Sequence, residues 1–214
     1  ETNMSKPLIS KLLGYPEYKR RYLAHMRTLL MENFANGNYI TRAQAMQAIA
    51  DSSIQADINK FYTYTQFQNS LTTAVSGGMG SLPGISQLMS VRTTWLLSQP
   101  QFTAVAPVVS AVTVNPSVPV FGSLSAITCQ VSNCTTVRLG YRDATWKKFN
   151  YIQMYDDGNH NDGGAGDGIY GASFTITSPL MDYYIYAENT NAGIFSPERA
   201  EHEFYQLATS VPTA

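Results

Sequence analysis

The sequence predicts a multidomain α+β protein in which an N-terminal α-helical segment precedes a seven-stranded immunoglobulin-like β-sandwich. Apolar residues recur at spacings of three and four between Lys6 and Gln99, which is the period of amphipathic helices. Beyond Pro107 they alternate, which is the period of half-buried strands. A chain of 214 residues is long enough for two such domains. We therefore assign residues 1–102 to the helical segment and residues 103–214 to the sandwich.

The first segment is expected to contain four helices. The first begins at Pro16, whose fixed φ suits a first helical turn, and ends at Gly37. Thr41 followed by Gln44 has the spacing of a capping box, so a second helix is expected to begin there. Asp51 is expected to cap a third helix, because its carboxylate can accept hydrogen bonds from orphan backbone amides.

The third helix is expected to continue to Tyr62, with a short extension through Leu71. The glycine-rich run Ser76–Gly84 then predicts a surface loop. The fourth helix begins at Ile85 and ends at Pro100, because proline interrupts helical hydrogen bonding.

Short alternating segments separated by turn residues predict the seven strands of the sandwich. They are expected near Val109–Val114, Leu124–Val131, Thr136–Arg142, Phe149–Tyr155, Tyr170–Ile176, Tyr183–Glu188 and Glu203–Leu207.

Composition and charge limit the partners and the location. Charged residues make up 14% of the chain, against roughly 25% in an average soluble domain, so we expect a secreted, periplasmic or cell-surface protein. The net charge is −1 and the longest basic run is Lys19–Arg21, so no nucleic acid partner is expected. No apolar run approaches the ~18 residues of a membrane span. The chain opens at Glu1 without a signal peptide, so a signal or anchor is expected upstream.

Three blocks of the helical segment share one family pattern. They are GYPEYKRRYLAHMRTLL (Gly14–Leu30), DINKFYTY (Asp57–Tyr64) and PGISQLMSVRTTWLLSQ (Pro83–Gln99). Together they resemble the C-terminal flank of the CotH-type (spore-coat protein H-like) atypical kinases, in which a P-x-Y-x-x-R-Y helix and a final helix close the large lobe. The positions that match the family are Pro16, Tyr18, Arg21, Tyr22, Gly84, Ile85 and Arg92.

The sandwich carries a further block, MYDDGNHNDGGAGDGIYGASF (Met154–Phe174), accompanied by DYYIYAEN (Asp182–Asn189) and SPE (Ser196–Glu198). It resembles the immunoglobulin-like or fibronectin-III-like module that follows such kinase domains in secreted bacterial proteins. The resemblance implies a kinase-like fold and ATP-dependent phosphoryl transfer for the family. Its nucleotide-binding strands and catalytic acids lie upstream of the matched blocks, so no catalytic or cofactor-binding residue is carried over.

Three functions stay open on these grounds. In the first, the chain is the non-catalytic C-terminal portion of a secreted or cell-surface bacterial CotH-like protein. Its partner is then the upstream part of its own polypeptide, and the sandwich is a structural or binding module. In the second, the chain completes the large lobe of an ATP-dependent CotH-type kinase.

The third function is an independent glycan-binding or adhesion module that binds protein or glycan at the cell surface. Tyr183 and Ile185 are expected on one face of their strand, with Tyr184 and Tyr186 on the other. One pair is then expected to be exposed, where a tyrosine ring can stack on a sugar.

One loop of the sandwich is a candidate calcium site, because carboxylate and amide oxygens are the ligands that Ca²⁺ prefers. The candidate ligands are Asp156, Asp157, Asn159, Asn161, Asp162 and Asp167. The loop is not an EF-hand, because Asp162 and Gly168 stand where its glycine and its bidentate glutamate belong. The alternative is that these side chains bond their own backbone in successive turns. No other cofactor is expected.

The cysteines and histidines predict no further site. Cys129 and Cys134 flank a tight turn and form either a hairpin disulfide or two buried thiols. The three histidines lack metal-ligand spacing, so no zinc is expected. We expect His25 on a flank of the first long helix, His160 in a turn where it bonds the backbone, and His202 on a strand.

Overall fold

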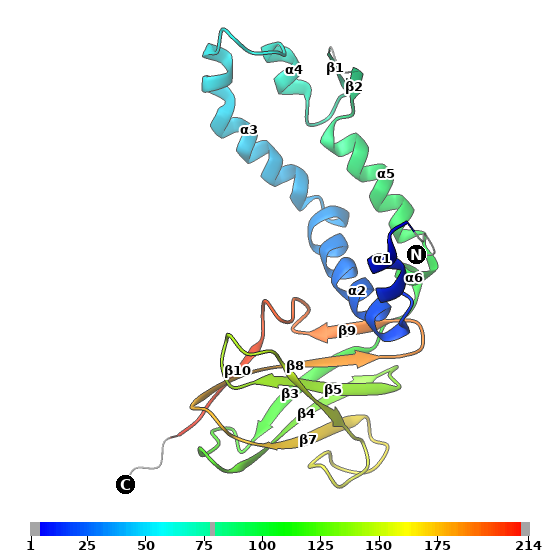
Figure 1. Ribbon diagram of the computed structural model, residues 1–214, viewed down its shortest axis with the longest axis vertical. Coiled ribbons are helices and arrows are strands. Elements are labelled where there is room, and N and C mark those ends of the chain that lie inside the picture. The colour runs from blue at the N-terminus through cyan, green and yellow to red at the C-terminus, as the bar shows by residue number, and fades with distance from the viewer. Residues whose placement is uncertain (1–4, 78–79, 211–214) are drawn as a thin grey trace. The chain divides into compact units, whose positions relative to one another are not determined.

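The computed structural model describes residues 5–77 and 80–210 (Figure 1). The chain forms two compact units. One unit combines the chain up to His25 with the residues from Ala104 onward, and the other is Met26–Thr103. These units differ from the predicted ranges 1–102 and 103–214, because the first part of the chain packs with the sandwich. Below they are called the sandwich unit and the helical unit.

The helices follow the predicted apolar periods only in part, because the helix expected to run to Tyr62 ends at Ala56 and the first long helix changes type near its end. The long first helix becomes a π-helix, η1, in its last six residues. The elements are α1 (Pro7–Leu12), α2 (Pro16–Leu29), η1 (Leu30–Ala35), α3 (Asn38–Ala56), α4 (Tyr64–Asn69), α5 (Ile85–Leu97) and α6 (Pro100–Thr103).

The predicted helix starts at Thr41 and Asp51 are wrong. Helix α3 begins at Asn38, directly after Gly37 in the left-handed conformation, and runs unbroken to Ala56 because it contains neither glycine nor proline. Asp51 caps nothing; its carboxylate instead accepts hydrogen bonds from the Tyr64 hydroxyl at 2.8 and 2.9 Å, which joins α3 to α4.

A capping box forms later in the chain, at the start of α4. The Thr63 hydroxyl accepts a hydrogen bond from the Gln66 amide at 3.1 Å, and the Gln66 side-chain oxygen accepts one from the Thr63 amide at 2.8 Å. The predicted loop Ser76–Gly84 contains a short antiparallel hairpin of β1 (Val75–Gly77) and β2 (Gly80–Leu82). Gly78 and Met79 of that loop lie outside the described residues.

The sandwich consists of two antiparallel sheets (Figure 1). One sheet has the order β3-β4-β7, and the other has the order β10-β8-β5-β6 with β9 also paired to β8. The strands are β3 (Val108–Asn115), β4 (Leu124–Ser132), β5 (Thr136–Arg142), β6 (Asn150–Met154), β7 (Ile169–Thr175), β8 (Leu180–Glu188), β9 (Gly193–Ser196) and β10 (Tyr205–Ala208). The described residues thus hold ten strands in three sheets, not seven; β9 and the β1–β2 hairpin were not predicted.

The main core lies between the two sheets. Its side chains come from the inward faces of the strands and are almost fully buried, which is the principal source of stability for such a sandwich. The core includes Ile127, Cys129, Val137, Leu139, Met154, Phe174, Ile176, Met181, Ile185 and Leu207.

A second core lies on the outer face of the five-stranded sheet, where Ala24 of α2 packs with aromatic side chains of the sandwich. Tyr184 and Tyr186 of β8 are both 0% exposed, and Tyr183 on the opposite face is 5% exposed. The prediction that one tyrosine pair of this strand is exposed is therefore wrong. The other members of this second core are Phe149, Phe195, Ala200 and, partly buried, Phe204.

Two glycines make room for the buried tyrosine rings. A Cβ at Gly140 would lie 2.6 Å from the Tyr184 ring, and a Cβ at Gly193 would lie 2.5 Å from the Tyr186 hydroxyl. Any other residue at either position would push a ring outward, toward the side chains that cover it. The sheet is thus shaped to hold both tyrosines beneath its outer cover.

The packing of α2 on the sheet predicts a strong effect of substitution at Ala24. Replacing Ala24 with Arg forces a long charged side chain into the second core, so we expect a loss of about 1–3 kcal/mol in the free energy of unfolding. Ala45 lies exposed on α3, and its replacement with Arg is the matched control, expected to change stability by less than about 0.5 kcal/mol. Urea unfolding measures the free energy of unfolding of both variants. Equal losses for the two substitutions would contradict the packing of Ala24 in the second core.

Candidate functional site

The contact of α2 with the sandwich is built around a bidentate ion pair. Arg20 Nε donates to Glu188 Oε2 at 2.9 Å, and Arg20 Nη2 donates to Glu188 Oε1 at 3.1 Å. The Tyr186 hydroxyl donates to the same carboxylate at 2.7 Å. The Glu188 side chain is only 6% exposed, so these partners satisfy a charge that would otherwise be costly to bury.

These partners also set the ionisation of Glu188. Burial alone would raise the pKa of its carboxyl, but the hydrogen bonds from Arg20 and Tyr186 outweigh burial and hold the pKa below its usual value. A lowered pKa means that the carboxylate stabilises the fold above the usual carboxyl range, about pH 4, and that this contribution is lost as the pH falls through the lowered value. The ion pair is therefore intact in neutral and mildly acidic solution.

Arg21, a residue of the P-x-Y-x-x-R-Y pattern, holds the neighbouring turn of α2. Its guanidinium lies 4.6 Å from the centre of the Tyr186 ring and 4.8 Å from that of Tyr151, within the range of cation–π attraction. Glu17 forms an ion pair with Arg21, with 3.0 Å between Oε1 and Nη2, and accepts a hydrogen bond from Arg138 of β5. The first turns of α2 are thus fixed to both β5 and β8.

The tyrosine hydroxyls beneath the helix form a continuous hydrogen-bonded chain. Tyr184 donates to Glu201 Oε1 at 2.8 Å, and the Tyr151 and Tyr184 hydroxyls lie 2.9 Å apart. Burial, followed by these hydrogen bonds, raises the pKa of Tyr184 far above its usual value, so the phenol stays neutral. We find here a satisfied structural network with no group poised for proton transfer.

The acidic loop, which carries the six predicted calcium ligands, is organised around Asp162. This side chain is 0% exposed; its Oδ2 accepts from the amides of Asp157 (2.5 Å) and Gly158 (2.8 Å), and its Oδ1 accepts from the His160 amide at 2.7 Å. A Cβ at Gly171 would lie 2.1 Å from the His160 carbonyl oxygen, so glycine is required where the loop crosses β7. Burial would raise the pKa of Asp162, but these amide hydrogen bonds lower it overall.

Asp156 and Asp167 fix the second half of the loop in the same way. Asp156 accepts from the amides of Gly166 and Gly168 at 2.7 and 3.0 Å. Asp167 accepts from the amides of Gly164 and Ile169 at 2.8 and 2.9 Å. Their carboxylates therefore serve as caps for the backbone of successive turns, as in the alternative to calcium.

The remaining predicted ligands lie at the exposed start of the loop. Asp157 Oδ1 accepts from the Asn159 amide at 2.9 Å and lies 2.8 Å from His160 Nδ1, and the contact with His160 lowers the pKa of Asp157. Asn161 holds a left-handed conformation, with φ of 60°.

One group of side chains in this loop could hold a metal ion. Among the Asp, Glu, His and Cys side chains that the structure describes, Asp157, His160 and Asp162 bring ligand atoms within 4.8 Å of one another. Both Asp162 oxygens already accept amide hydrogen bonds, so the donor set fits a cation only in part. Calcium at this loop stays a prediction.

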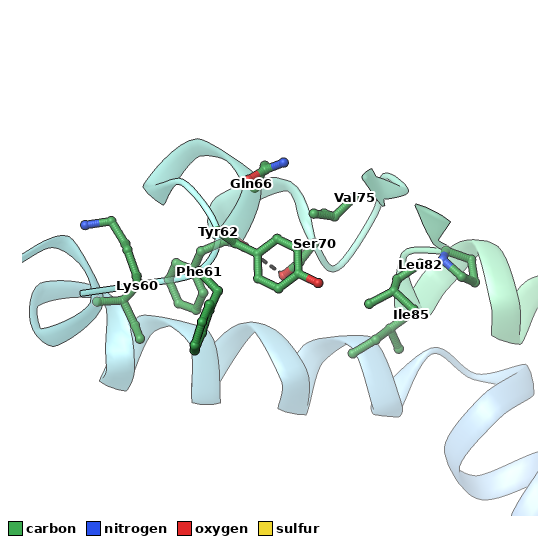
Figure 2. A pocket seen from close by; sticks show the side chains of 11 residues that line it. Lys60, Phe61, Tyr62, Gln66, Ser70, Val75, Leu82 and Ile85 are labelled. Atoms are coloured by element: carbon green, nitrogen blue, oxygen red, sulfur yellow. Dashed lines mark hydrogen bonds between the residues drawn. The ribbon is translucent and has the colours of Figure 1, made fainter. Parts of the chain in front are cut away.

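A groove opens on the helical unit between the end of α3, α4, the β1–β2 hairpin and the start of α5. Its volume is about 550 Å³. Figure 2 shows Lys60 and Phe61 at one end and Leu82 and Ile85 at the other. Apart from Lys60, Gln66, Ser70 and the Tyr62 hydroxyl its lining is apolar, so the groove offers apolar surface and no grouping of acids, bases or nucleophiles.

The cysteines and histidines occupy structural positions. Cys129 and Cys134 are free thiols, and burial raises the pKa of Cys129 to about 12. The His160 imidazole was expected to bond the backbone, but its Nδ1 atom lies 2.8 Å from the Asp157 carboxylate instead. His202 lies in a turn and not on a strand. His25 lies on α2, as expected, with its ring stacked on Phe195.

Comparison with protein families places both parts of the chain. The family "CotH kinase protein" matches residues 1–76, and the family "Conditioned medium factor 2nd Ig-like domain" matches residues 129–180. Residues 1–76 thus match a CotH-type segment, and an Ig-like module follows at residues 129–180. Among curated proteins, no sequence matches it. The acidic loop and most of the sandwich core thus belong to the Ig-like module.

Solved structures show only a distant likeness to this chain. A cycloalternan-degrading enzyme from Trueperella pyogenes in complex with isomaltose is 16% identical, with a TM-score of 0.35 over 47% of this chain and 12% of its own. The carbohydrate binding module of the muscle glycogen-targeting subunit of Protein Phosphatase-1 is 16% identical, with a TM-score of 0.32 over 56% of this chain and 84% of its own. At such TM-scores neither structure indicates a function for this chain. No helix in the described part of the chain is long and apolar enough to span a bilayer.

The amide contacts of the acidic loop predict its response to calcium. Because the carboxylates of Asp156, Asp162 and Asp167 already bond backbone amides, we expect the same melting temperature in excess Ca²⁺ and in EGTA, by differential scanning calorimetry. A rise of several degrees in Ca²⁺, abolished by replacing the exposed Asp157 with Asn, would contradict this and would establish the predicted calcium site.

Proposed function

We propose that the chain is the non-catalytic C-terminal portion of a secreted or cell-surface bacterial CotH-like protein. Its helical unit packs against the upstream part of the same polypeptide, and the Ig-like module is a structural module that braces helix α2. The observation that carries this proposal is the contrast in burial between the two units. The sandwich unit has two cores, whereas the helical unit leaves most of its large apolar side chains in contact with solvent.

The helical unit has little core of its own. Among its described residues, the buried hydrophobic side chains are Leu30 and Leu71. Phe61 is 100% exposed and Ile58 is 92% exposed. Further exposed apolar side chains are Leu29, Met31, Met46, Ile49, Leu82, Ile85, Leu88, Val91, Trp95 and Leu97. Apolar exposure on this scale marks an interaction surface.

The exposed apolar side chains follow helical spacing, which indicates that they face a partner. On α5 they stand at positions 85, 88, 91 and 95, which are separations of three and four residues. Stripes of this kind pack against other helices. The CotH match covers α1 to α4, so the natural occupant of this surface is the remainder of a CotH-type domain.

A second candidate function is that this packing completes the large lobe of an ATP-dependent CotH-type kinase. The match to a family described as kinases favours it. Phosphate transfer from ATP by the longer polypeptide, but not by this chain alone, would distinguish it from a purely structural role. An independent glycan-binding module is less favoured, because the tyrosines of β8 that were expected to stack on a sugar are buried.

Substitutions at Phe61 and Leu30 test the proposed surface. In this chain alone, Phe61→Ser is expected to change the free energy of unfolding by less than about 0.5 kcal/mol, whereas Leu30→Ala costs about 2–5 kcal/mol because Leu30 is buried. In the longer polypeptide, Phe61→Ser is expected to cost about 3 kcal/mol, as for a buried aromatic ring.

Urea unfolding of both variants in both polypeptides provides the measurement. The proposal fails if Phe61→Ser has no effect in the longer polypeptide. It also fails if Phe61→Ser is as costly as Leu30→Ala in this chain alone.

A further inference from the structure

His25 occupies the end of the segment of α2 that packs on the sandwich. It is the last residue of the sandwich unit in this helix, and Met26 begins the helical unit. Its ring stacks on Phe195 of β9, with ring centres 4.4 Å apart and planes inclined by 20°. Its neighbour Ala24 belongs to the second core. The imidazole therefore forms part of the apolar contact that holds this turn of the helix on the sheet.

The charges around His25 do not favour an imidazolium. Arg21, one turn earlier on α2, and His202, from the turn after β9, are basic, and Glu201 from the same turn is the acidic group that faces it. The Glu201 Oε1 atom already accepts a hydrogen bond from the Tyr184 hydroxyl at 2.8 Å. Arg199 and Glu203, also in this turn, pair with each other at 2.8 Å. Phe195 carries no charge, but its ring face attracts a cation at this distance and so opposes the basic neighbours.

We propose that mild acid loosens the packing of helix α2 on the sandwich through protonation of His25. A neutral imidazole stacks on Phe195 without a charge to desolvate. An imidazolium there loses water and faces two basic groups and one acidic group, and we take these costs to exceed the attraction of the Phe195 ring for a cation. The strength of this contact, at the last turn of α2 that packs on the sandwich, therefore depends on pH. This inference goes beyond the proposed function, because it holds for the chain whatever the longer polypeptide does.

The direction of the pH effect follows from linkage. Burial has the largest influence and lowers the pKa of His25 below that of a free histidine. The charge of Glu201 raises this pKa, whereas those of His202 and Arg21 lower it further. The released helix then binds a proton more readily than the packed helix. Packing is consequently strongest above about pH 6.5 and weakens as the pH falls below that value. The Arg20–Glu188 pair stays charged throughout this range, because the pKa of Glu188 is lowered from an already acidic value.

Hydrogen exchange on the full chain tests the proposal. Between pH 7.5 and pH 5.0, after correction for intrinsic exchange, we expect amide protection in residues 20–25 to fall by about three- to tenfold. Protection of β4 and β5 in the sandwich core is expected to stay unchanged. His25→Phe keeps an aromatic ring on Phe195 without a titrating group, and is expected to remove the pH effect. His202→Gln is the matched control and is expected to retain it.

An NMR titration of the three imidazoles gives a second readout that needs no variant to fold. We expect the His25 ring to titrate below pH 6.5. A His25 pKa at or above 6.5, or equal protection of residues 20–25 at the two pH values, overturns the proposal. Persistence of the pH effect in His25→Phe overturns it as well.

Discussion

The packing of helix α2 on the sandwich is centred on the ion pair between Arg20 and Glu188. A carboxylate that is 6% exposed at the end of β8 requires a positive partner, and the partner comes from a helix 168 residues earlier in the chain. Arg21, Ala24 and His25 follow on the same side of that helix, and together they bury the outer face of the five-stranded sheet. Helix α2 is therefore an integral part of the Ig-like module's packing.

The helical unit contrasts with this arrangement. Its helices are joined by hydrogen bonds such as Tyr64 to Asp51, yet its apolar stripes remain exposed. A helix with an unpaired apolar face gains most of its stability from a partner. Helix α2 thus begins in a unit with two buried cores and ends in a unit whose large apolar side chains are mostly exposed.

Periodicity predicted the elements well, because the spacing of apolar residues reports directly on buried faces. Periodicity correctly predicted that helices give way to strands near residue 103, and it predicted seven of the strands of the sandwich. It could not predict which helix covers the outer sheet face, since alternation along β8 shows two faces without saying that both are buried. Capping residues were ambiguous for a similar reason, because Thr41–Gln44 and Thr63–Gln66 have the same spacing. Thr41 lies inside α3, whereas Thr63 directly precedes α4 and forms the capping box. In the acidic loop, the sequence left two interpretations, calcium ligation and side-chain bonding to the loop's own backbone. The carboxylates of Asp156, Asp162 and Asp167 accept hydrogen bonds from backbone amides, and calcium stays a prediction.

The most direct test is a double-mutant cycle between Arg20 and Glu188, measured by urea unfolding at pH 7. The variants are Arg20→Met, Glu188→Gln and the pair together. Because each group is the other's charged partner in a largely buried contact, we predict a coupling free energy of about 1–3 kcal/mol. Additive effects, with a coupling below about 0.3 kcal/mol, would show that α2 does not hold the sandwich through this pair and would contradict the account.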